Sequence, residues 1–170
     1  MTTLMSTIAS VSPPRAVSPV PPAWARNAVA PASAPLPAAV RDLVASARRS
    51  LTEAVIASTP CERYAAAHLA ALRAAAAVLA ARSRPSGKRR RQVRSVWVVL
   101  PEVAIEFTEW AAFFATSARK RSAAEAGVPC VTPREADDLV RDADAFLARV
   151  TGTLGLPHQS MLIAGLRHTG

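Results

Sequence analysis

The chain of 170 residues carries 21 Lys and Arg against 12 Asp and Glu, which gives a formal net charge of +9. Its length suits one ordinary domain, or one domain with a tail. The 38 Ala, 6 Gly and 14 Pro exclude collagen-like and coiled-coil proteins. They also disfavour an all-β fold, because Ala, Leu and Arg are strong helix formers. We therefore expect an all-α domain.

The sequence lacks the patterns of a metal site, a secretion signal or a membrane span. Cys61 and Cys130 lack zinc-ligand spacing, so we expect free thiols in a reducing compartment. No basic residue precedes Arg15, whereas a signal peptide begins with a basic region. Arg73 interrupts the longest Ala-rich run. These features predict a cytoplasmic protein with no cofactor, no metal and no membrane partner.

The N-terminal region, residues 1–36, holds seven of the 14 prolines and no acidic residue. Proline lacks an amide hydrogen and disfavours helix in the residue before it. We therefore predict a disordered Pro/Ala-rich tail over 1–36. Residues 37–154 are expected to form the folded domain, and 155–170 a flexible C-terminal tail.

Two amphipathic helices are predicted in the first half of the domain. Apolar residues at helical spacing place the first helix at about 38–57. They form an apolar stripe along one face of this helix: Val40, Leu43, Val44, Ala47, Leu51, Ala54 and Val55. The second helix begins with a capping box, in which Thr59 is the N-cap and Glu62 the N3 residue. It is expected to run to about Arg82.

Two further helical segments follow. The first spans about 92–126, where Pro101 either kinks the helix or begins a second piece, and Gly127 ends it. The last begins at a second capping box, Thr132 to Glu135, and runs to about Leu154. Its apolar residues predict a buried face, and four carboxylates are expected to face water: Asp137, Asp138, Asp142 and Asp144. Short connections favour an up-and-down bundle of four to five helices.

The positive charge is concentrated between the second and third helical segments. Residues 82–94 contain seven basic residues and no acid: Arg82, Arg84, Lys88, Arg89, Arg90, Arg91 and Arg94. Such a segment attracts phosphate backbones, so RNA or another polyanion is a candidate partner. The alternative is a solvated loop, since no aromatic residue is interleaved with the arginines for base stacking.

Arg63 and His68 form an R-x4-H pair near the start of the second helix. A histidine can transfer protons in RNA cleavage, and an arginine can stabilise charge on the phosphate, without a metal ion. Positions five apart are about 140° apart around a helix axis, so Arg63 should point away from His68. A core or interface role for His68 is the alternative.

Glu102, Glu106 and Glu109 share one face of the third segment. They could form a carboxylate metal site, but no Glu-x-x-His motif accompanies them. We expect instead a solvated acidic face that pairs with nearby arginines.

Three stretches, at 63–82, 95–114 and 132–146, resemble a family of small stand-alone HEPN-domain proteins from high-GC Gram-positive bacteria. The resemblance covers about 38–152. It implies an α-helical bundle that is often dimeric, hence a homodimer. Many HEPN proteins are metal-independent ribonucleases with an R-x4–6-H motif, and others are non-catalytic RNA-binding or partner modules.

Two features favour the non-catalytic class. Active members usually have a polar residue directly after the arginine, where this chain has Tyr64, and their motif lies in later helices. Our leading hypothesis is a nucleic-acid-associated HEPN-like module without strong catalysis that uses 82–94 for contact. The alternatives are a ribonuclease that uses Arg63 and His68, and a protein-interaction module.

Overall fold

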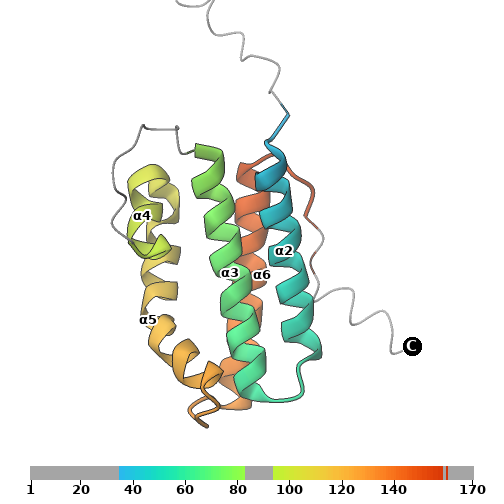
Figure 1. Ribbon diagram of the computed structural model, residues 1–170, viewed down its shortest axis with the longest axis vertical. Coiled ribbons are helices and arrows are strands. Elements are labelled where there is room, and N and C mark those ends of the chain that lie inside the picture. The colour runs from blue at the N-terminus through green and yellow to red at the C-terminus, as the bar shows by residue number, and fades with distance from the viewer. Residues whose placement is uncertain (1–34, 83–93, 159, 161–170) are drawn as a thin grey trace, which may run out of the picture. The chain divides into compact units, whose positions relative to one another are not determined.

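A computed structural model describes residues 35–82, 94–158 and 160 of the chain. These residues form helices and contain no strand, which confirms the predicted all-α fold. The helices α2 (Ala38–Ile56), α3 (Pro60–Arg82), α5 (Thr108–Glu125) and α6 (Pro133–Thr153) run up and down along one another (Figure 1). The short α4 (Val96–Val103) and the 3-10 turn η1 (Ile105–Phe107) lead into α5. The expected tail over 1–36 lies almost wholly outside the described residues, and the domain boundaries stay predictions.

Both predicted capping boxes are present. Thr59 Oγ1 accepts a hydrogen bond from the amide of Glu62 at 3.2 Å, while the Glu62 carboxylate accepts one from the Thr59 amide at 3.2 Å. Thr132 and Glu135 make the same reciprocal bonds at the start of α6. Each box satisfies two amides that the first helical turn leaves without partners. The starts of α3 and α6 are therefore set locally by the sequence.

The helical segment predicted at 92–126 is divided, and the break lies beyond Pro101. Pro101 sits inside α4, where it cannot donate the bond to the carbonyl four residues earlier. The chain leaves helical geometry at Ala104, with φ −150° and ψ 77°, and η1 then carries Phe107 into the core. Gly127 follows α5 at φ +74°, as expected for a residue after a helix end. The sequence predicted either a kink at Pro101 or a second helix that begins there. The break at Ala104 agrees with neither prediction.

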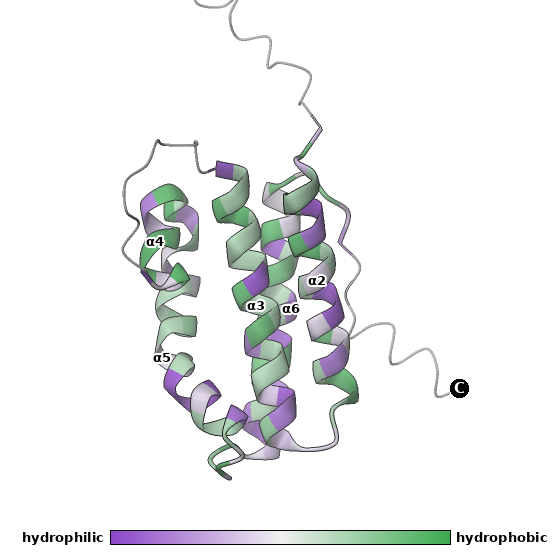
Figure 2. Cartoon of the chain, viewed as in Figure 1, coloured by the Kyte–Doolittle hydropathy of each residue, from purple (hydrophilic) through white to green (hydrophobic). Residues whose placement is uncertain are grey.

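The core forms around α3, which contacts α2, α4, α5 and α6. Figure 2 shows mainly apolar colours along α3 and hydrophilic patches along α2. The buried face of α3 is largely alanine, and these residues are fully buried: Ala67, Ala70, Ala71, Ala74, Ala75 and Ala77. On the side of α4 and α5, an aromatic cluster fills the space, with Trp97 stacked on Phe114 at 5.1 Å between ring centroids. Small residues on α3 thus allow close packing of its neighbours.

Two predictions about exposure are wrong. Val55, assigned to the apolar stripe of α2, is 41% exposed. Asp144, expected to face water, is only 5% exposed, because it lies four residues after Val140 and three before Leu147 and so shares the buried face of α6.

In the sequence, Arg73 interrupts the Ala-rich run, which predicts that no run is long enough to span a membrane. By length and apolar composition, however, α3 is long and apolar enough to do so. Half of its most apolar window is buried among the other helices. The core helix of a globular bundle has the same composition, and the central place of α3 accounts for it.

Candidate functional site

His68 is fully enclosed in the core of the bundle. Its side chain lies on α3 with no exposed surface, and the rings of Trp97 and Phe114 contact it edge-on, each at 5.7 Å between centroids. Its Nε2 donates a hydrogen bond to the main-chain carbonyl of Phe114 at 3.0 Å, since a carbonyl can only accept. Burial lowers the pKa of His68 below its usual value. The ring is therefore held neutral and away from solvent.

Arg63 lies in the first turns of α3 and faces α6. Its Nη1 donates to Oδ1 of Asp137 at 2.7 Å, and Nη2 donates to the carbonyl of Ala57 at 3.2 Å. Its side chain remains 25% exposed. Arg63 and His68 are not brought together within one chain. Their spacing predicts this separation, because positions five apart point to different sides of a helix. The catalytic assignment of this pair stays a prediction without geometric support.

Both described ends of the basic segment are paired with acids. Arg82 donates to Glu106 at 2.5 Å, and Arg94 donates to both oxygens of Glu102, at 3.0 and 2.5 Å. These hydrogen bonds lower the pKa of both carboxyls. The expected pairing of this acidic face with arginines is confirmed for these two residues. The other basic residues of the segment lie outside the described part of the chain: Arg84, Lys88, Arg89, Arg90 and Arg91.

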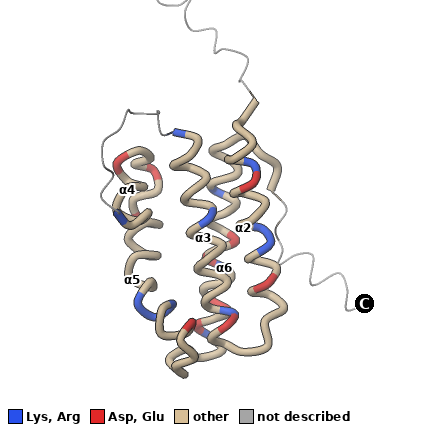
Figure 3. The backbone as a smooth tube through the Cα atoms, viewed as in Figure 1, with Lys and Arg blue, Asp and Glu red and all other residues tan. Residues whose placement is uncertain are grey.

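The described bundle is close to neutral. It contains all 12 acidic residues of the chain, whereas eight of the 21 basic residues lie outside it. Figure 3 shows both signs interspersed over the helices. Within the described residues, no group of three or more His, Cys, Asp or Glu side chains could hold a metal ion. The charge excess of the chain thus lies mainly in the basic segment and in the terminal regions.

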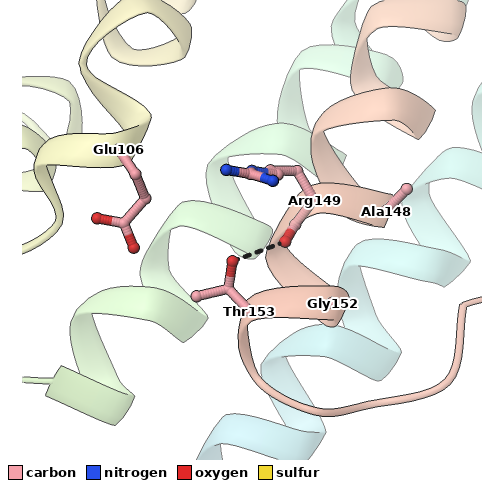
Figure 4. A pocket seen from close by; sticks show the side chains of 5 residues that line it. All are labelled: Glu106, Ala148, Arg149, Gly152 and Thr153. Atoms are coloured by element: carbon pink, nitrogen blue, oxygen red, sulfur yellow. Dashed lines mark hydrogen bonds between the residues drawn. The ribbon is translucent and has the colours of Figure 1, made fainter.

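A pocket of about 490 Å³ lies between η1 and the last turns of α6 (Figure 4). Its lining residues are Glu106, Ala148, Arg149, Gly152 and Thr153. The carboxylate of Glu106 and the guanidinium of Arg149 extend into the space from opposite sides. Since Glu106 also binds Arg82, the pocket adjoins the residue at which the basic segment begins. Sequence reasoning did not single out Arg149, because Glu106, on the opposite side of the pocket, lies far from it in the sequence.

A second pocket, of about 450 Å³, is lined by Val55, Arg63, Asp137, Val140 and Arg141. The two arginines in its wall are paired with Asp137 and Asp138, respectively. Its charges are therefore balanced locally, and it offers no surplus cation to an anionic ligand.

The segment after α6 folds back onto the bundle. Gly155, at φ +67°, turns the chain, and Leu156 packs against the core. The carbonyl of Pro157 accepts a hydrogen bond from Arg48. Asp144 accepts a hydrogen bond from Ser160 at 2.5 Å and lies 3.5 Å from Nε2 of His158. Ser160 thus satisfies Oδ2 of Asp144, whereas Oδ1 and both ring nitrogens of His158 have no hydrogen-bond partner among the described residues.

Comparison with known families identifies the chain. The family model of the SAV_6107-like HEPN domains matches residues 54–151, which is more than half of the chain. The chain belongs to the HEPN-domain family. The match contains α3, the basic segment and nearly all of α6 of this HEPN domain. No curated protein and no solved structure gives a significant match to the chain.

Proposed function

We propose that this HEPN-domain protein is a module without strong catalysis that binds RNA through its basic segment, 82–94. The single observation that carries the proposal is the concentration of charge. Seven basic residues and no acid occupy these 13 positions, whereas the described bundle is nearly balanced. Membership in a family whose members are often associated with nucleic acid supports the same conclusion. As part of the proposal, the protein acts in the cytoplasm as a homodimer.

The absence of strong catalysis is supported by the surroundings of His68. A general acid or base must come within hydrogen-bonding distance of the reacting oxygen, and His68 is fully buried with its Nε2 bound to Phe114. Arg63 is directed to Asp137 instead. Cleavage of RNA in EDTA by the purified protein, lost in both Arg63→Ala and His68→Ala while each variant keeps its fold, would contradict this part of the proposal.

The binding itself is tested with the full chain and a labelled single-stranded RNA, measured by fluorescence anisotropy over a series of salt concentrations. Arg89→Ala/Arg90→Ala/Arg91→Ala should weaken binding and lower the salt slope by about 2, because each phosphate contact on a single strand contributes about 0.7. The charge-matched control is Arg49→Ala/Arg119→Ala/Arg134→Ala, which removes three exposed arginines from the helices.

Two results would overturn the proposal. One is a wild-type protein that does not bind RNA even at low salt. The other is equal weakening by the two triple variants, which would show that net charge alone governs the interaction. A partner protein recovered without nucleic acid in either case would favour the protein-interaction alternative. Sedimentation tests the homodimer, whose mass should be twice 17.9 kDa.

A further inference from the structure

The pocket between η1 and α6 lies where α3 ends and the basic segment begins. Arg82 is the last residue of α3, and its guanidinium donates to Glu106 at 2.5 Å and to the carbonyl of Val103 at 3.4 Å. Glu106 in turn forms one wall of the pocket, and Arg149 of α6 forms the other. A polyanion that reaches Arg82, the first residue of the basic segment, would therefore lie close to the pocket.

Arg149 is available for an external anion. Its side chain is exposed, and its guanidinium makes no hydrogen bond or ion pair within the described residues. Besides the hydrogen bond from Arg82, its positive charge contributes to lowering the pKa of Glu106 across the pocket, and its main-chain carbonyl accepts a hydrogen bond from the hydroxyl of Thr153 at 2.9 Å (Figure 4). A guanidinium presents a planar fork of donors that matches two phosphate oxygens. The pocket volume of about 490 Å³ leaves room for a phosphate group with part of its sugar.

Glu106 opposes the same anion. The hydrogen bond from Arg82 keeps this carboxylate ionised at neutral pH, and the carbonyl end of α6 adds partial negative charge. The pair of Arg82 and Glu106 also removes Arg82 from the cations free to meet a phosphate. Neutralising Glu106 would release Arg82 and remove the repulsion in one step.

We propose that this pocket holds one phosphate group of the bound RNA, that Arg149 is its contact, and that Glu106 limits the affinity. The inference rests on the proposed function, which supplies the RNA, but it concerns residues outside 82–94 except for Arg82. It predicts opposite effects for Arg149→Ala and Glu106→Gln. Net charge alone would shift binding in the same two directions, so the effect of Arg149→Ala has to exceed that of a charge-matched control outside the pocket.

The experiment compares three single variants of the full chain by anisotropy with the same single-stranded RNA. Arg149→Ala should weaken binding about three- to tenfold and lower the salt slope by about 0.7, the contribution of one phosphate. Glu106→Gln should tighten binding several-fold. Arg134→Ala is the matched control, since its side chain is 92% exposed and lies on the first turn of α6, at the other end of that helix.

The outcomes separate this inference from the proposed function. If the wild-type protein binds RNA and Arg149→Ala behaves as Arg134→Ala does, the pocket is not a phosphate site, and the basic segment alone binds. Weaker binding by Glu106→Gln would overturn the role of that carboxylate. A wild-type protein that fails to bind RNA refutes the proposed function, and the inference with it. Equal urea midpoints for the three variants verify that each remains folded.

Discussion

The imidazole of His68, on α3, donates a hydrogen bond to the main-chain carbonyl of Phe114, on α5, at 3.0 Å. The ring thereby links two helices from the middle of the core, in contact with Trp97 and Phe114. A residue type that suggests acid–base chemistry in the sequence serves here as a packing and hydrogen-bonding group.

His68→Ala should therefore destabilise the bundle, by about 2–4 kcal/mol, because it removes a buried hydrogen bond and leaves a cavity. Arg63→Ala should cost only about 0–1 kcal/mol, since its ion pair with the half-exposed Asp137 is accessible to solvent. Urea unfolding followed by circular dichroism measures both. Equal stabilities for the two variants would refute the structural role of His68.

The stability of the protein should also depend on pH through His68. Burial lowers its pKa in the folded state, while the unfolded chain titrates near 6.5. Below about pH 6.5 the unfolded chain binds a proton at His68 that the native state does not bind. The contribution of neutral His68 to the free energy of unfolding is therefore complete above about pH 6.5, and it is lost as the pH falls toward the pKa of the folded state. His68→Leu removes the effect. Urea unfolding of both proteins between pH 5 and 8 gives the difference, and parallel profiles would contradict the prediction.

The alanine face of α3 should tolerate little added volume. Ala74 is fully buried where the helix meets its neighbours, so Ala74→Leu should cost about 1–3 kcal/mol by overpacking. Ala80→Leu, at an exposed position of the same helix, is the matched control and should change stability by less than about 0.5 kcal/mol. If thermal unfolding shows the two variants to be equally stable, α3 is not packed as closely as its burial indicates.

The segment after α6 should depend on Asp144 for its docking. Asp144→Ala removes the acceptor of Ser160 and the neighbour of His158. We expect faster hydrogen exchange at the amide of Leu156, which bonds to the carbonyl of Thr151 at 2.8 Å. Asp142→Ala, on the same helix, serves as control. Unchanged exchange in Asp144→Ala would mean that the packing of Leu156 and the hydrogen bond from Arg48 to Pro157 hold the segment without Asp144.

Local signals in the sequence were sufficient to predict most of the fold. The periodicity of 38–57 and the capping boxes at Thr59 and Thr132 predicted α2, α3 and α6 nearly to the residue, because a helix start depends on hydrogen bonds within a few residues. The division at Ala104 was not predictable in the same way. Pro101 weakens the helix locally, but the place of the break depends on how Phe107 enters the core.

The charge and the positions of the candidate residues were determined by the sequence alone. It placed seven basic residues within 82–94 and set Arg63 and His68 on different sides of one helix. Only the tertiary structure decided what surrounds them. It enclosed His68 among aromatic rings, paired Arg82 with Glu106, and brought Asp144 against His158 and Ser160. Burial and ion pairing depend on side chains that are distant in the sequence, and helical periodicity carries no information about which helices become neighbours.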